Sequence, residues 1–151
     1  MQSSKRSVKL LAITCVCLVV SACSGTRPAY LGTEQSALTL CPSTPNCVSS
    51  LTDEDSDHAI SAIPFSDQSS MHSALIEAVN ANASAELIVN TPNYVYAEYT
   101  SSLMKYVDDV EFLFSTSEKV IHVRSASRVG RSDFGVNRER IEQLRSQLTN
   151  K

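Results

Sequence analysis

Hydrophobic residues recur at helical spacing in two parts of the chain. In the first, Met71, Leu75 and Val79 stand four residues apart. A stripe with this period faces the core when the segment is an α-helix. Serine and aspartate residues at 66–69 are typical N-caps, so we predict a helix that follows them and ends by Asn82.

The second helical pattern lies at the end of the chain. Ile141, Leu144 and Leu148 form its apolar stripe. Asn137 precedes the stripe as an expected N-cap, and Glu139 suits the positive N-terminus of a helix. We therefore predict a C-terminal amphipathic helix.

Between the two helices the pattern changes to the alternation that is typical of strands. The segments predicted as strands are Glu86 to Asn90, Asn93 to Ser101, Asp109 to Ser115 and Lys119 to Ser127. A short edge strand is also expected within His58 to Phe65. The apolar run from Leu103 to Val107 is either a strand extension or a loop over the sheet, and the pattern does not decide between them.

The last two strands have a predictable register. Phe112 and Phe114 alternate on one strand, and Ile121 and Val123 alternate on the other. A two- or four-residue loop places both sets on one face, whereas a three-residue loop sends one set to the opposite face. The favoured register places Phe112 opposite Val123. It also places Glu111 opposite Arg124 and Leu113 opposite His122.

This register predicts a two-layer α+β fold. We expect a mostly antiparallel sheet of four or five strands, with both helices on its apolar face, in a single globular domain over residues 41–151. The second face of the sheet is expected to be polar. Its members are Tyr94, Tyr96, Glu98, Asp109, Glu111, His122, Arg124 and Arg128.

The N-terminus is typical of an exported lipoprotein. Residues 1–22 combine a basic start with an apolar run of eleven residues, Leu10 to Val20. A helix needs about 20 residues to span a bilayer, so this run suits a signal peptide. Small residues followed by Cys23 resemble a lipobox, which predicts cleavage, acylation (palmitate) of Cys23 and a membrane anchor.

Residues 23–40 are small and polar, and we expect them to be a tether between the anchor and the domain. Ser24 stands where, by resemblance, an aspartate would favour the inner membrane. The expected location is therefore the bacterial cell envelope, at the outer membrane and facing the periplasm.

Two cysteines remain after the anchor. Cys41 and Cys47 flank a turn with two prolines, and an oxidising compartment favours a disulfide between them. A metal site is the alternative, but the three histidines show no paired metal spacing, and we predict neither a metal nor a cofactor. An acidic loop over residues 48–57 lacks the glycine and distal glutamate of a calcium loop.

Charge argues against one class of partner. Removal of the signal takes three of thirteen basic residues and no acidic residue, which leaves a net charge of −6. General nucleic-acid binding is therefore not expected. From Glu34 to Glu118 there are thirteen acidic residues and one basic residue, whereas Lys119 to Lys151 contains eight basic and three acidic ones. Such asymmetry predicts internal pairing between the two parts or a local anion site.

Three ordered motifs resemble a known family. They are CPSTPNCVSS at 41–50, DDVEF at 108–112, and RSASRVG at 124–130 running on to Asn137 and Arg138. Together they are similar to the domain of unknown function family 1499, small proteins that are often exported or lipid-anchored. The resemblance spans residues 41 to about 148 and implies an envelope location but no accepted activity. Its pattern commonly has tyrosine where this chain has Arg131, which weakens any essential role for Arg131.

The arginine-rich stretch from Val123 to Glu142 supports two interpretations. In the first, Arg124, Arg128, Asn137 and Arg138 form a strand–loop–helix site for a small anion, a lipid headgroup or an envelope protein partner. In the second, the arginines pair with Asp108, Asp109 and Glu111 in an ion-pair latch between loop and sheet. The second is favoured because the register places these acids next to the arginines.

An enzymatic alternative is a hydrolase that acts on an envelope substrate. It would use Asp108 and Asp109 with His122 as acid and base. Adjacent residues of a strand point to opposite faces, so the two aspartates do not readily share a substrate. We therefore expect a non-enzymatic binding or structural module, and no catalytic residue is assigned.

Overall fold

The computed structural model describes residues 24–54 and 56–149. The expected signal peptide 1–22, the expected lipidation site Cys23, and one residue of the acidic loop lie outside the described residues. No helix within the described ranges is both long enough and apolar enough to cross a bilayer.

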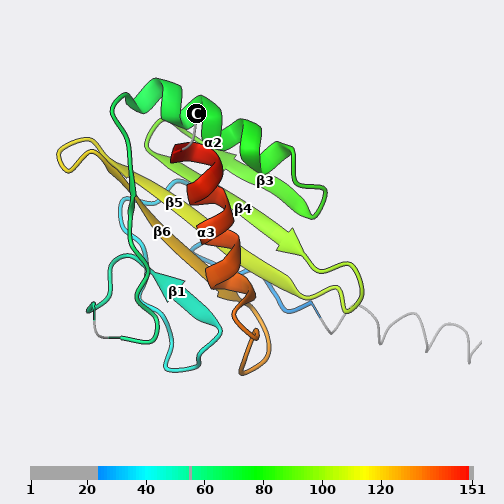
Figure 1. Cartoon of the computed structure of the whole chain (residues 1–151). Helices are drawn as coiled ribbons and strands as arrows, with labels where there is room; N and C mark the ends of the chain where they lie inside the picture. Colours follow the sequence, from blue (N-terminus) through cyan, green and yellow to red (C-terminus); the bar gives the residue numbers. More distant parts are fainter. Residues whose placement is uncertain (1–23, 55, 150–151) are drawn as a thin grey trace, which may run out of the picture.

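An antiparallel sheet is the centre of the fold (Figure 1). Its main order is β1-β6-β5-β4-β3, and β2 pairs with β6 beside β1. The strands are β1 (Cys47–Ser49), β2 (Ile63–Pro64), β3 (Ala85–Asn90), β4 (Tyr94–Thr100), β5 (Val107–Ser115) and β6 (Val120–Ser127). The α+β prediction is confirmed, although β1 was not expected.

The predicted register of the last hairpin is confirmed. Phe112 pairs with Val123, and Glu111 pairs with Arg124. The turn between β5 and β6 covers residues 116–119, and its four residues are one of the two expected lengths. It closes with Lys119 in the left-handed region, at φ 55°. The segment at 103–106 forms the exposed turn between β4 and β5, and Val107 begins β5.

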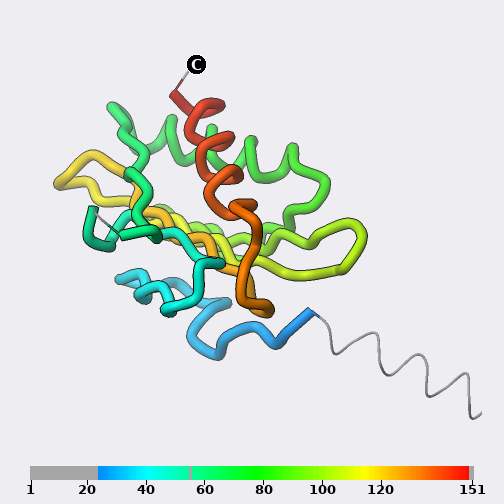
Figure 2. The backbone as a smooth tube through the Cα atoms, turned by 60° about the horizontal axis from the view of Figure 1, so that its bottom comes forward, coloured from blue at the N-terminus to red at the C-terminus, as the bar shows by residue number. Residues whose placement is uncertain are grey.

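Two helices cover the apolar face of the sheet (Figures 1 and 2). They are α2 (Gln68–Asn80) and α3 (Val136–Thr149). As predicted, Leu75 and Val79 are buried on α2, and Ile141 is buried on α3. Each large apolar side chain that leaves water in this core stabilises the fold by about 1.5–3 kcal/mol.

The start of α3 differs from the prediction that Asn137 is its N-cap. The helix begins at Val136, and Asn137 is a fully buried residue of its first turn. The cap comes instead from Asp133, whose carboxylate accepts the backbone N–H groups of Gly135 and Asn137 at 3.1 and 2.8 Å. The hydrophobic stripe indicated the helix but not which of two nearby capping residues turns its side chain back to the amides.

Residues 24–40, which we call the strap, do not form the free tether that the sequence suggested. Figure 2 shows the strap on the side of the sheet opposite the helices. Leu31 and Leu38 are buried there against Val89, Tyr94 and Tyr96. The small, polar residues of the segment indicated a linker, but its two leucines pack against the second face of the sheet.

A disulfide joins the strap region to β1. Cys41 and Cys47 are bonded, with their Cα atoms 5.7 Å apart. The bond closes a loop of only a few residues, so it stabilises the fold by about 2 kcal/mol in the chain-entropy view. It holds the chain that follows the strap next to the edge strand β1.

We expect the strap to contribute to global stability. Leu31→Ala should lower the free energy of unfolding by about 2 kcal/mol or more, because it leaves a cavity in a packed site. Leu40→Ala is the matched control, since Leu40 lies in the same segment but is 77% exposed. Urea unfolding of both variants checks this, and equal midpoints would show that the strap is loose.

Candidate functional site

The polar residues of β5 divide between the two faces of the sheet. Asp109 and Glu111 point to the strap side, whereas Asp108 points to the helix side. This is the alternation that strand geometry requires. All three carboxylates are buried, with exposed fractions of 8% or less, so each requires a compensating partner.

Glu111 is the most deeply buried of the three. It accepts a hydrogen bond from the Tyr94 hydroxyl at 2.9 Å and another from an Arg124 guanidinium nitrogen at 3.1 Å. Burial raises the pKa of Glu111, and the attraction of Arg124 opposes that rise. Arg124 is itself only 6% exposed, and its Nε has no partner among the described residues. The pair is therefore enclosed.

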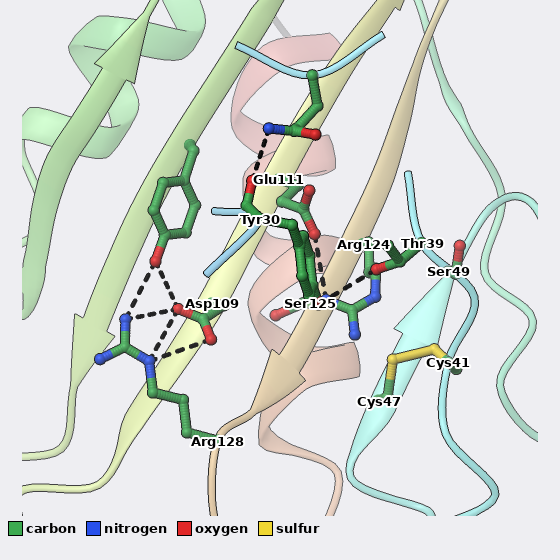
Figure 3. A network of polar contacts seen from close by, with 12 residues as sticks. Tyr30, Thr39, Cys41, Cys47, Ser49, Asp109, Glu111, Arg124, Ser125 and Arg128 are labelled. Carbon is green, nitrogen blue, oxygen red and sulfur yellow. Dashed lines mark hydrogen bonds and ion pairs between the residues drawn. A yellow bond between two sulfur atoms is a disulfide. The ribbon is translucent and has the colours of Figure 1, made fainter. Parts of the chain in front are cut away.

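Arg128 forms the second cluster on the strap side (Figure 3). Its Nε donates to both carboxylate oxygens of Asp109, at 3.0 and 3.1 Å. A second nitrogen donates to Asp109 at 2.7 Å, to the Tyr96 hydroxyl at 3.0 Å and to Glu98. Despite burial, these hydrogen bonds raise the pKa of Arg128. An arginine that makes several hydrogen bonds to one carboxylate forms one of the stronger ion pairs in proteins.

The strap covers this second cluster with a cation of its own. Arg27 donates to Glu98 at 2.5 Å, and its guanidinium carbon lies 5.8 Å from the centre of the Tyr96 ring. Burial acts to raise the pKa of Glu98, but hydrogen bonds from Arg27, Tyr96 and Arg128 outweigh it, and the pKa is lowered. Glu98 thus connects β4, the β6–α3 loop and the strap.

On the helix side, Asn137 ties α3 to three segments. Its side-chain amide nitrogen donates to the backbone oxygen of Asn46 at 3.2 Å, to the Ser127 hydroxyl at 3.0 Å and to Asp133 at 2.8 Å. Its oxygen accepts from the Ser125 hydroxyl. This fully buried amide is therefore satisfied at both ends, which makes it a positioning element for the loop between β6 and α3.

Arg140 neutralises the carboxylate that faces the helices. It donates to Asp108 at 2.6 Å and to the Asn137 oxygen at 2.8 Å. Its guanidinium carbon also lies 4.6 Å from the centre of the Tyr99 ring. Asp108 therefore pairs with α3, not with Arg124 or Arg128.

Arg138 points to another part of the structure. Its two terminal nitrogens donate to the backbone oxygens of Ala59 and Asp57 at 2.7 and 2.8 Å. The structure therefore does not bring Arg138 together with Arg124 and Arg128. The four residues considered for an anion site have four separate sets of partners, all of them within the fold.

The groups considered for hydrolysis are also apart. His122 pairs across the sheet with Leu113, and Asp109 pairs with Ala126, so they differ by four positions along the strands. That separation is about 13 Å. The His122 ring instead contacts Glu118 at 2.7 Å and Ser50 at 3.3 Å. Asp108 lies on the other face, so no acid–base pair forms among these residues.

Sequence reasoning did not identify Arg27, Asp133 or Arg140. Arg140 had a usable signal, because strand alternation puts Asp108 on the face opposite Asp109, and a buried carboxylate on the helix side requires a cation from the covering helix. Arg27 had none, since nothing in the composition of the strap indicates packing. Within the described ranges, no three His, Cys, Asp or Glu side chains are grouped to hold a metal ion.

Comparison with known proteins gives one family match. The model of the family described as "Protein of unknown function (DUF1499)" matches residues 37–148, well over half of the chain. No curated protein matches the chain. The match begins within the strap and ends in α3, so it includes both polar clusters of the sheet except Arg27.

The Arg124–Glu111 pair gives a prediction on stability. Arg124→Met should destabilise the domain by about 3 kcal/mol or more, because Glu111 would remain buried without a counter-charge. Adding Glu111→Gln should recover part of this loss, since the amide keeps an acceptor for Tyr94 but carries no charge. Chemical denaturation measures all three proteins.

The control for this series is Arg131→Met, because Arg131 is exposed in the same stretch. It should change stability by no more than about 0.5 kcal/mol. A double variant no more stable than Arg124→Met would contradict the role assigned to the pair.

The Asp133 cap gives a prediction on pH. Burial acts to raise the pKa of Asp133, but hydrogen bonds from Asn137 and Gly135 outweigh it and lower the pKa. Its contribution is therefore complete above the unfolded value of about 4 and is lost as the pH falls through the folded value. Asp133→Asn should cost about 1 kcal/mol at pH 7. It should also reduce the loss of stability below about pH 4.

Thermal melts from pH 7 to pH 2.5 test this effect of Asp133→Asn. Asp53→Asn in the exposed acidic loop is the control. If the melting temperature of Asp133→Asn fell at low pH as much as that of wild type, the cap carboxylate would not contribute to the pH dependence of stability.

Proposed function

Because the chain belongs to the DUF1499 family of proteins of unknown function, we propose its function from its own residues. It is a non-enzymatic, lipid-anchored module of the bacterial envelope, in which the arginine-rich strand–loop–helix serves as a structural latch. The module is anchored through Cys23 at the outer membrane and faces the periplasm. Its proposed partners are the membrane and the lipid or protein surfaces next to it.

One observation carries this proposal: the buried arginines already have carboxylate partners within the fold. Arg124 binds Glu111, Arg128 binds Asp109 and Glu98, and Arg140 binds Asp108. A small anion at Arg124 or Arg128 would have to displace a buried carboxylate and leave it unpaired, which is costly. The geometry therefore favours the latch over a small-anion site.

The latch has a mechanical consequence for an anchored protein. Arg128 holds β4 through Glu98, and Glu98 in turn binds Arg27 of the strap. The strap is thereby part of the folded domain, not a flexible linker. A lipid on Cys23 would transmit its position directly to the sheet, so the module would keep a defined orientation at the membrane surface.

The non-enzymatic part of the proposal rests on the same contacts. The sequence-predicted acid–base candidates lie about 13 Å apart or on opposite faces of the sheet, as strand spacing dictates. A hydrolase would need them within hydrogen-bond reach of one substrate. No observation in the structure favours that alternative.

The anchor is tested on the mature protein purified from bacterial membranes. Wild type should have an intact mass increased by acyl chains and should remain with the membrane fraction, because acyl groups on Cys23 partition into lipid. Cys23→Ala should lose the added mass. Cys17→Ala is the matched control and should keep it, since Cys17 lies in the segment expected to be removed.

Intact-mass spectrometry with membrane fractionation gives both readouts. A wild-type protein that is recovered in the soluble fraction without acyl mass would contradict the anchor. Such a result would leave the ion-pair latch unaffected, because the latch is tested separately by stability.

A further inference from the structure

We infer that one end of the molecule is a membrane-seating surface that inserts apolar loop tips between anionic lipid headgroups beside the anchor. The surface consists of the β4–β5 turn, residues 101–106, and residues 130–136, which are the end of the β6–α3 loop and the first residue of α3. We call it the seating surface. The inference rests on the proposed lipid anchor and extends it from a single point of attachment to a face.

The two loops and the start of the strap lie at the same end of the sheet. The backbone N–H of Arg128 donates to the Val107 oxygen at 3.0 Å, which joins the base of one loop to the base of the other. Gly25 packs against the same point. A Cβ placed on Gly25 would meet Arg128 and Val129 atoms at 2.9 Å. Figures 1 and 2 both show the strap beginning between these loops.

The anchor position follows from chain length. Cys23 is bonded to Ser24, and consecutive Cα atoms are about 3.8 Å apart. Ser24 precedes Gly25, which packs against Arg128 and Val129, so a lipid on Cys23 would be attached two residues from this contact. A free tether would have allowed the domain to turn any face to the membrane. The strap contacts instead bring this end to the lipid surface.

Exposed apolar side chains are concentrated on the seating surface. Eight large hydrophobic residues are exposed within the described ranges, and five of them lie on the seating surface. Phe134 is 97% exposed, and Leu103 is 86% exposed. The five are Leu103, Met104, Tyr106, Phe134 and Val136. Such side chains at loop tips suit insertion at a membrane interface better than they suit a groove for a protein partner.

Phe134 adds an observation that packing does not explain. Its φ is 54°, in the left-handed region that is an outlier for a bulky residue. The backbone therefore holds an aromatic ring in water at a conformational cost. A role for the ring outside the domain accounts for both the strain and the exposure.

The charges at this end suit an anionic leaflet. Lys105 and Arg131 are exposed and form no ion pair within the described residues. The chain is acidic overall, with a formal net charge of −3, so these two cations stand out against it. Basic residues next to apolar tips are attracted to anionic headgroups while the tips enter the interface.

The experiment uses a tryptophan reporter, since the chain contains no tryptophan. Phe134→Trp is made in the mature, lipidated protein, which is reconstituted into phosphatidylethanolamine–phosphatidylglycerol vesicles containing brominated lipids. We expect a blue-shifted emission that the bromines quench. The control is Ser117→Trp in the exposed β5–β6 turn, at the other end of β5. That end is roughly 27 Å away, and we expect no quenching there.

A charge reversal tests the electrostatic part with a close control. Lys105 and Lys119 are both exposed turn lysines in the left-handed region, at φ 57° and 55°, but they lie at opposite ends of the sheet. In the Phe134→Trp background, Lys105→Glu should shift the ratio of seated to unseated protein by about fivefold or more, the factor for one basic residue near an anionic surface. Lys119→Glu should leave it unchanged.

The outcomes separate this inference from the anchor. Membrane-bound protein with tryptophan at 134 quenched no more than tryptophan at 117 would overturn the seating surface and leave the anchor intact. Protein that does not associate with vesicles even after lipidation would overturn both. Equal effects of Lys105→Glu and Lys119→Glu would overturn the role of the local charge.

Discussion

Burial of three carboxylates within four positions of β5 constrains most of the structure around them. Asp108, Asp109 and Glu111 cannot remain charged in the interior without cations, and each cation comes from a different position. Arg124 comes from β6, Arg128 from the loop that follows, and Arg140 from α3. The requirement for pairing therefore fixes how strand, loop and helix meet.

The hydrophobic pattern predicted the sheet and its register because period-two alternation has only one solution when one face is buried. That register placed Glu111 opposite Arg124, and the structure has the same pairing. The predicted start of α3 was wrong, because Asp133 and Asn137 are both good capping residues and only the path of the loop decides between them. The packing of the strap could not be predicted, since two leucines in a polar segment carry no periodic signal.

The structure revised the sequence-based interpretation of the candidate site more than that of the fold. The clustering of arginines in the sequence suggested a shared anion site. Strand alternation and helical geometry instead point their side chains in different directions, so they bind different partners. Arg138 binds backbone oxygens of the β1–β2 connection, whereas Arg128 binds Asp109 on the strap side of the sheet. A count of charges along the chain cannot show this, because pairing depends on the direction of each side chain.

The strap also sets an order for folding. Arg27 is 71 positions before its partner Glu98, and it completes a cluster that includes Arg128, which lies later still. Such non-local contacts form only after the entropy of closing the intervening loop has been overcome. The segment synthesised early is therefore expected to find its place last, after β4, β5 and β6 have assembled. A nascent chain would meanwhile expose the buried carboxylates and tyrosines of the sheet to water.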